Sequence, residues 1–188
     1  MQDIYQIEAG TRIDQAQSYI RAYPHLLAVL SARQVLAEQD LIAGAHMVYG
    51  WMPTILEIHP GESTGIEEGV VLLNRARVEG QLSVDDIGRL ASLINRSVVG
   101  ASKLLHFVNP AAFAIWDSRI YRFIHRKTPH QYRVNNAAEY VRYLILLRQL
   151  QQDARFQDFH ASINRKMGYQ VSALRALEVV MFLNTPVD

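Results

Sequence analysis

The chain has 188 residues, of which 49% are hydrophobic and 20% are charged, with a formal net charge of +1 and no cysteine. These proportions are those of an ordinary globular protein, so a disordered or fibrous chain is not expected. The lack of cysteine excludes disulfides, thiolate zinc sites and cysteine-held iron–sulfur clusters from this sequence. We expect a single all-helical domain over residues 1–188 that carries no cofactor.

The N-terminal residues MQDIYQIEAG lack the apolar centre of a signal peptide, and no apolar run approaches the ~18 residues of a membrane span. We therefore expect a cytoplasmic protein that does not enter a membrane. His46, His59 and His106 are dispersed and lack metal-ligand spacing, so no metal site is expected. The oligomeric state is not determined by any of these features.

Helical periodicity begins near the N-terminus. Residues 11–20 carry apolar side chains at helical spacing, and Pro24 is expected to end this helix. Residues 26–37 and 39–51 are also helix-like. The second of these segments is apolar on nearly every face, which indicates a buried helix.

The middle of the chain contains clear start and stop signals. Residues 59–65 form a loop rich in turn residues, and Ser63 or Thr64 is expected to cap the helix that follows. That helix closes at Gly80, and Ser83 is a good N-cap for the next one.

The C-terminal third repeats this pattern. Asn135 or Asn136 is expected to cap a long helix, another helix ends at Gly168, and residues 171–183 form a last apolar helix. The chain shows no alternating strand pattern and no internal repeat. The sequence therefore predicts an all-α compact bundle of about eight or nine helices.

Basic residues are concentrated in one central segment, residues 96–133. It holds seven of the 19 basic residues but only one of the 18 acidic ones, Asp117. A basic segment in an otherwise acidic chain is a candidate surface for DNA or RNA phosphates, or for an acidic protein partner.

Residues 116–126 read as a helix with two different faces. Trp116 continues an apolar face and is expected to pack in the core, while Arg119, Arg122 and Arg126 share another face. This arginine row is able to follow a phosphate backbone, although a solvated or acid-paired helix face has the same pattern. The candidate nucleic-acid contacts are Arg119, Arg122, Arg126, Lys127, His106 and Tyr121.

Asp117 and Lys103 are the candidate catalytic residues. Asp117 begins a helix, so its carboxylate is a candidate N-cap, and a carboxylate set among bases is also a candidate catalytic group. Lys103 lies upstream in an apolar helix, and the turn at Asn109 and Pro110 brings the chain back toward it. Lys103 is either a group that shares a pocket with Asp117 or an ordinary solvated lysine.

The order of these features resembles the helix-hairpin-helix DNA glycosylase superfamily. A helix ending near Ser97 is followed by the glycine-containing hairpin SVVGASK, an apolar helix, a proline turn and FAIWDSRI, over roughly residues 93–126. The resemblance implies an all-α protein that binds DNA phosphates at the hairpin amides and uses Asp117 in N-glycosidic bond cleavage. Lys103 matches the lysine nucleophile of those members that form a Schiff base.

Other interpretations remain open at this point. Arg175 and Glu178 lie three residues apart on an apolar helix, where they either pair with each other or reach Asp117 or its arginines. A protein with the same scaffold but no catalytic activity, binding nucleic acid or a protein, fits the basic segment equally well. A small accessory protein of a mobile element or defence system is a further alternative.

Overall fold

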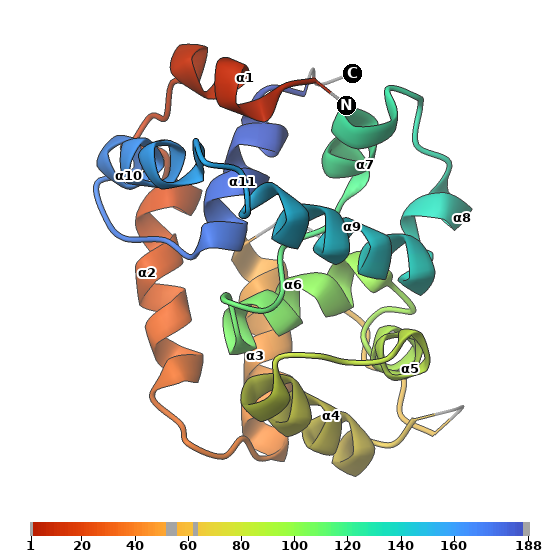
Figure 1. The fold of residues 1–188 in the computed structure, drawn as a ribbon. Coiled ribbons are helices and arrows are strands. Elements are labelled where there is room, and N and C mark those ends of the chain that lie inside the picture. The colour runs from red at the N-terminus through yellow and green to blue at the C-terminus, as the bar shows by residue number, and fades with distance from the viewer. Residues whose placement is uncertain (1, 52–55, 62–63, 186–188) are drawn as a thin grey trace.

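The computed structural model describes residues 2–51, 56–61 and 64–185. Within these ranges the chain is all-helical, with eleven α-helices and one isolated antiparallel bridge between Ile58 and Ile94 (Figure 1). The helices are α1 (Ile4–Gly10), α2 (Ser18–Ser31), α3 (Glu38–Trp51), α4 (Ile66–Glu79), α5 (Val84–Leu93), α6 (Val98–Val108), α7 (Ser118–His125), α8 (Gln131–Val134), α9 (Ala137–Leu150), α10 (Phe156–Met167) and α11 (Ala173–Leu183). The all-α prediction is confirmed, but the predicted number of helices was too low. With seven and four residues, α1 and α8 are too short to show a helical period.

Two apolar helices, α6 and α11, lie at the centre of the molecule. Every residue of α6 except Val99 is buried, and residues 174–181 of α11 are buried without interruption. Helix α6 packs against α2, α3, α4, α5 and α9, while α11 packs against α1, α7, α9 and α10 (Figure 1). The buried apolar side chains form one continuous core, so burial of these two helices drives the assembly of the whole bundle.

Most helix ends lie where local chemistry predicts them. Ser83 caps α5 in a capping box with Asp86, and the side chain of Asn136 accepts two backbone hydrogen bonds at the start of α9. Gly80 and Gly168 end α4 and α10 in the left-handed conformation that glycine adopts without steric cost. These caps confirm the predicted boundaries.

The predicted cap of α4 was wrong in part. Gly65, not Thr64, stands at the N-cap position of α4, and Ser63 lies outside the described residues. The hydroxyl of Thr64 is buried without a hydrogen-bond partner among the described residues. Helix α4 therefore begins without a side-chain cap.

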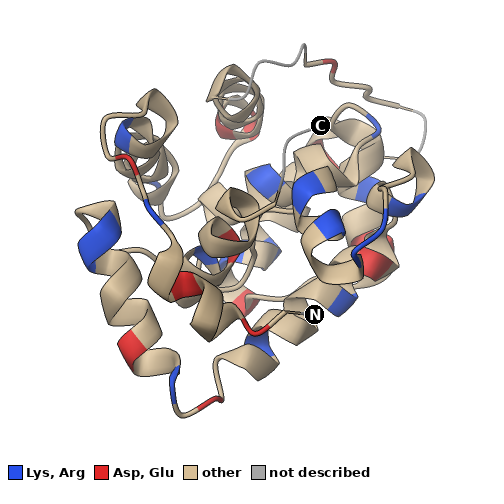
Figure 2. Cartoon of the chain, turned by 90° about the horizontal axis from the view of Figure 1, so that it is seen from above, with Lys and Arg blue, Asp and Glu red and all other residues tan. Residues whose placement is uncertain are grey.

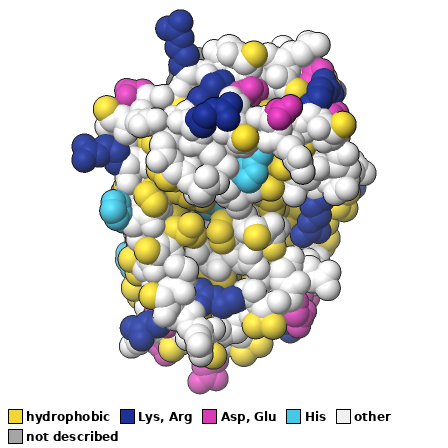
Figure 3. Space-filling view, turned by 60° about the vertical axis from the view of Figure 1, so that its left-hand side comes forward, with side chains coloured by type: hydrophobic (Ala, Val, Ile, Leu, Met, Phe, Trp, Pro, Cys, Tyr) yellow, Lys and Arg dark blue, Asp and Glu magenta, His cyan; other side chains and the backbone are white. Residues whose placement is uncertain are grey.

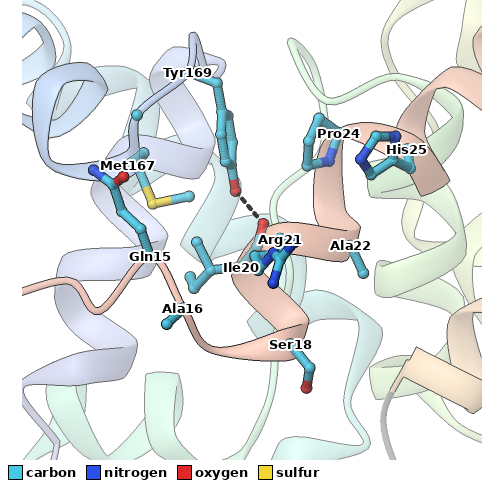
Figure 4. Close-up of a pocket in the computed structure, with 11 residues that line it drawn as sticks. Gln15, Ala16, Ser18, Ile20, Arg21, Ala22, Pro24, His25, Met167 and Tyr169 are labelled. Carbon is cyan, nitrogen blue, oxygen red and sulfur yellow. Dashed lines mark hydrogen bonds between the residues drawn. The ribbon is translucent and has the colours of Figure 1, made fainter.

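Pro24 does not break the helix that contains it, contrary to expectation. It lies inside α2, which replaces the two separate helices predicted at residues 11–20 and 26–37. A proline has no N–H to donate to the carbonyl four residues earlier, which here belongs to Ile20. The Tyr169 hydroxyl donates a 2.7 Å hydrogen bond to that carbonyl oxygen instead (Figure 4). A side chain from another part of the chain thus restores the bond that the proline removes.

The predicted glycine hairpin at residues 97–103 is helical. Helix α6 begins at Val98, and the connection from α5 is a short turn in which Asn95 and Arg96 have positive φ angles of 58° and 48°. Gly100 instead allows α6 to approach α3. A Cβ atom at this position would lie 3.0 Å from the Tyr49 Cζ atom and would overlap its hydroxyl oxygen.

The surface differs from one side to another. Seen from above, basic residues outnumber acidic ones on the side that carries α7 and α8 (Figure 2). On the face that carries α2 and α10, apolar side chains gather in the middle, with charged side chains above and below them (Figure 3). No helix in the described part of the chain is long and apolar enough to cross a membrane.

Candidate functional site

Helix α6 fixes the chain that leads to Asp117. The Ser102 hydroxyl accepts a 3.1 Å hydrogen bond from the Trp116 backbone N–H and lies 3.3 Å from the Trp116 carbonyl oxygen. The indole of Trp116 is fully buried and donates a 2.8 Å hydrogen bond to the carbonyl of Val134. Trp116 is therefore a core residue, as its pattern indicated, and the residue after it is held in a defined position.

Asp117 performs the capping role that the sequence suggested. It is the N-cap of α7, and its Oδ1 atom accepts a 2.9 Å hydrogen bond from the backbone N–H of Ile120. The side chain is only 9% exposed. The cap uses the Oδ1 atom of the carboxylate. Asp117 also lines a cavity.

That cavity has a volume of about 220 Å³ and is lined by residues of α2, α3, α11 and the chain that leads into α7. Its apolar wall is formed by Tyr19 of α2, Trp51 of α3, Phe182 of α11, and Ile115 from the connection between α6 and α7. Its charged lining residues are Asp117, Arg175 and Glu178. An apolar, aromatic cavity with a few convergent polar groups is the usual form of a small-molecule site.

Arg175 and Glu178 form a buried ion pair on α11. The guanidinium of Arg175 also lies over the ring of Tyr23, 4.9 Å from its centroid. Burial raises the pKa of Glu178 to about 7, and the charge of Asp117 acts in the same direction, while Arg175 opposes it. The first predicted alternative for this pair is confirmed, because the two residues pair with each other, and both also line the cavity that Asp117 lines.

Lys103 is a buried lysine, with only 7% of its surface exposed. The interpretation as an ordinary solvated lysine was therefore wrong. Burial lowers the pKa of Lys103 to about 8, and the negative charges of Asp117 and Glu178 oppose that shift. Lys103 is not among the residues that line the cavity, but its charge interacts with both carboxylates that do. The structure thus brings together three ionisable groups from α6, the start of α7 and α11.

The predicted arginine row is divided among different environments. Arg119 donates a 2.9 Å hydrogen bond to the carbonyl of Thr185 and lies over the Phe182 ring, 4.1 Å from its centroid. It therefore connects α7 to α11 and does not lie in an open row. Arg122 is half-buried, whereas Arg126 and Lys127 are exposed at the end of α7.

Two other predicted nucleic-acid contacts, His106 and Tyr121, are buried, which corrects the assignment of His106. His106 is fully buried, and its ring nitrogens lie 2.8 Å from the Tyr23 hydroxyl and 2.7 Å from the carbonyl of Phe113. Burial lowers the pKa of His106 to about 3, so the ring is neutral. Tyr121 is 2% exposed and packs against Trp116. His106 therefore presents no surface to a ligand, whereas Tyr121 is among the residues that line a cleft beside α7.

A basic cleft of about 250 Å³ lies beside the exposed end of α7. Its lining includes Lys127, His130 and Arg133, and none of its lining residues is acidic. The ring of Tyr132 stacks on His130 at 5.7 Å, and the guanidinium of Arg133 lies 5.6 Å from the Tyr132 centroid. The cleft joins positive charge to an exposed aromatic ring, which are the two features that bind single-stranded nucleic acid.

Three backbone amides at the turn between α5 and α6 are not free for the phosphate binding that the resemblance implies. The backbone N–H groups of Asn95 and Ser97 donate to the carbonyls of Glu57 and Ala91, each at 2.9 Å. The N–H of Val98 donates to the side chain of Asn135 at 2.6 Å. These three amides are already used within the protein, so phosphate binding there would require the turn to rearrange.

A second hollow lies where α2 begins, against the connection from α10 to α11 (Figure 4). Its volume is about 560 Å³, and the side chains of Arg21 and His25, which line it, are exposed. No cluster of three or more potential metal ligands occurs among the described residues. The cavity at Asp117, which is lined by buried ionisable groups, is therefore the stronger candidate for chemistry.

Comparisons with protein-family models, curated proteins and solved structures find no match for this chain. Functional argument therefore depends on the geometry of the site. Sequence reasoning had identified Asp117, Lys103 and the Arg175–Glu178 pair, because charged residues in apolar helices are conspicuous. It missed the aromatic wall, since nothing local distinguishes Tyr19 or Trp51 from other core residues.

Proposed function

We propose that this protein is similar in function to the helix-hairpin-helix DNA glycosylases, binding nucleic acid and cleaving an N-glycosidic bond at the Asp117 cavity. The observation that carries this proposal is that Asp117 and Glu178 line one aromatic cavity and that both interact with the buried charge of Lys103. Buried ionisable groups with shifted pKa values cluster at catalytic sites more often than elsewhere.

The cavity wall suits a flat ring. Tyr19, Trp51 and Phe182 offer aromatic surfaces against which a planar group stacks. The volume of about 220 Å³ is smaller than the ~300–1,000 Å³ clefts that enclose larger ligands, which favours a single small group such as one base. A base reaches such a pocket only after it is extruded from its strand.

Asp117 and Lys103 have separate roles in this proposal. The Asp117 carboxylate, held by its bond to the Ile120 N–H, is a fixed negative charge that stabilises the positive charge developing on the sugar. The Lys103 amine attacks the sugar carbon and forms a covalent intermediate. With a pKa of about 8, Lys103 is a free amine in roughly a tenth of the protein molecules at pH 7. At the ordinary pKa of 10.5 the fraction would be about one molecule in 3,000.

The exposed basic residues supply the nucleic-acid contact. Arg126, Lys127 and Arg133 are exposed at or beside the basic cleft and are available to phosphates. This replaces the contact through hairpin amides that the resemblance implies. The lack of acidic lining in the cleft also supports the second candidate function, a binding protein without catalysis, in which Asp117 is only a helix cap.

Borohydride trapping tests the catalytic proposal. We expect the wild-type protein to form a covalent adduct with DNA that contains an abasic site, because the Lys103 amine condenses with the sugar aldehyde and borohydride reduces the Schiff base. The Lys103→Gln variant should form none while keeping its helical circular dichroism spectrum. A wild-type protein that traps no single- or double-stranded abasic DNA would leave only the non-catalytic candidate.

A further inference from the structure

Glu178 is a buried acid in the cavity whose part in the reaction is not yet assigned. It is 1% exposed, and its carboxylate pairs with Arg175 one turn earlier on α11. It lines the same cavity as Asp117. An isolated ion pair of this kind rarely stabilises a fold more than apolar side chains of the same size, so its presence in a cavity calls for another reason.

The ionisable groups that interact with Glu178 come from several helices. Helix α6 contributes Lys103, the start of α7 contributes Asp117, and α2 contributes the hydroxyls of Tyr19 and Tyr23. Helix α9 contributes Tyr143, whose buried hydroxyl has no hydrogen-bond partner among the described residues. The acids Asp117 and Glu178 and the bases Lys103 and Arg175 have a net charge of zero when all four are ionised.

A proton that moves from Lys103 to Glu178 leaves this net charge unchanged. Burial brings the pKa of Lys103 down to about 8 and the pKa of Glu178 up to about 7, from ordinary values of 10.5 and 4.5. The transfer is therefore far less unfavourable here than in water. It produces a free amine at Lys103 and a protonated carboxyl at Glu178, which lines the cavity.

We propose that Glu178 is the general acid of this site, which protonates the departing base and then recovers a proton from the Lys103 nitrogen. The inference rests on the proposed glycosylase-like function. The Lys103 amine forms a bond to the sugar carbon while the carbon–nitrogen bond to the base breaks. The bonding pair leaves with the base, which takes the Glu178 proton, and the attacking nitrogen returns a proton to the Glu178 carboxylate.

The two carboxyl groups divide the work because their surroundings differ. The Asp117 carboxylate accepts a hydrogen bond from the Ile120 backbone N–H, which fixes its position in the cavity near the sugar. Glu178 lies in a more deeply buried position, where the protonated form is favoured. Pairs of carboxyl groups in unequal environments commonly separate into acid and anion in this way.

Two reactions separate the role of Glu178 from the role of Lys103. Base release is measured on oligonucleotides that each carry one uracil, hypoxanthine or 8-oxoguanine, and borohydride trapping is measured on DNA with a preformed abasic site. Abasic DNA has no base to protonate. We expect Glu178→Gln to reduce base release by about 100-fold or more, the usual range for a lost general acid. Trapping should be retained or become faster, because loss of the negative charge lowers the pKa of Lys103.

Each other outcome decides against a specific claim. Base release by Glu178→Gln at the wild-type rate, or a wild type that traps abasic DNA but releases none of the three bases, overturns the role of Glu178 alone. Failure of the wild type to trap overturns the proposed function, and the inference with it. If Glu178→Gln does not fold, Arg175→Met/Glu178→Gln, which leaves no unpaired charge, undergoes the same two assays with the same expected results.

Discussion

With ordinary pKa values, Lys103 and Glu178 would carry opposite charges at pH 7. Burial shifts both pKa values in the direction that favours the uncharged form of each side chain. This shift has a cost in folding free energy, because the unfolded chain solvates both charges. The site is therefore kept at the expense of stability, which is common where ionisable groups serve chemistry rather than packing.

This leads to a prediction for stability against pH. Between pH 4.5 and about 7 the folded chain keeps the Glu178 proton that the unfolded chain has lost, so stability should fall as pH rises. Between about pH 8 and 10.5 the folded chain has lost the Lys103 proton that the unfolded chain keeps, so stability should rise again. In each of these two pH ranges, the free energy of unfolding should change by on the order of 3 kcal/mol.

Urea denaturation across this pH range checks both effects. The difference in unfolding free energy between wild type and Glu178→Gln isolates the lower window, and the difference from Lys103→Met isolates the upper one. Difference curves that stay flat in both windows would show that the two groups titrate normally and would remove the electrostatic basis of the site.

At the scale of single elements, α2 shows how a local rule is overridden by a distant contact. A proline inside a helix costs about 3 kcal/mol, partly through the lost hydrogen bond. The Tyr169 hydroxyl supplies that bond at the Ile20 carbonyl, from a connection that lies far away in the sequence (Figure 4). Helix α2 therefore continues past Pro24. Tyr19, in the first turn of the same helix, forms part of the cavity wall.

A double-mutant cycle tests this explanation of α2. Tyr169→Phe should destabilise the wild type by about 1 kcal/mol, since it leaves the Ile20 carbonyl without a partner. In a Pro24→Ala background the alanine N–H is available to that carbonyl, so Tyr169→Phe should cost much less. Equal losses in the two backgrounds, measured by urea unfolding, would mean that Tyr169 does not compensate for the proline.

At the scale of the whole molecule, the exposed basic residues are different from the residues of the proposed catalytic cavity. The buried cluster of Lys103, Asp117, Arg175 and Glu178 is neutral when fully ionised, whereas the exposed residues at and beyond the end of α7 are mainly basic. A nucleic acid would be held by the exposed charges and placed into the cavity by the aromatic wall. Binding and catalysis should therefore respond to different substitutions.

Salt dependence tests the binding half of this division. Arg126→Ala/Lys127→Ala should weaken binding to DNA or RNA and reduce the slope of log affinity against log salt by roughly two, because two phosphate contacts are lost. The control Arg12→Ala/Arg21→Ala removes the same charge from exposed positions elsewhere and should change the slope little. Fluorescence anisotropy at several salt concentrations measures both. Equal effects of the two variants would mean that only net charge matters.

Local signals in the sequence were sufficient for the helical class, the caps at Ser83 and Asn136, and the glycine stops at Gly80 and Gly168, because each depends on atoms within a few residues of one another. Asp117 was also recognisable as a cap for this reason. The tertiary structure alone decided that His106 is buried, that Arg119 connects to α11, and that Glu178 shares a cavity with Asp117. These facts depend on which helices pack together, and packing is set by the shape of the assembled core rather than by any short stretch of chain.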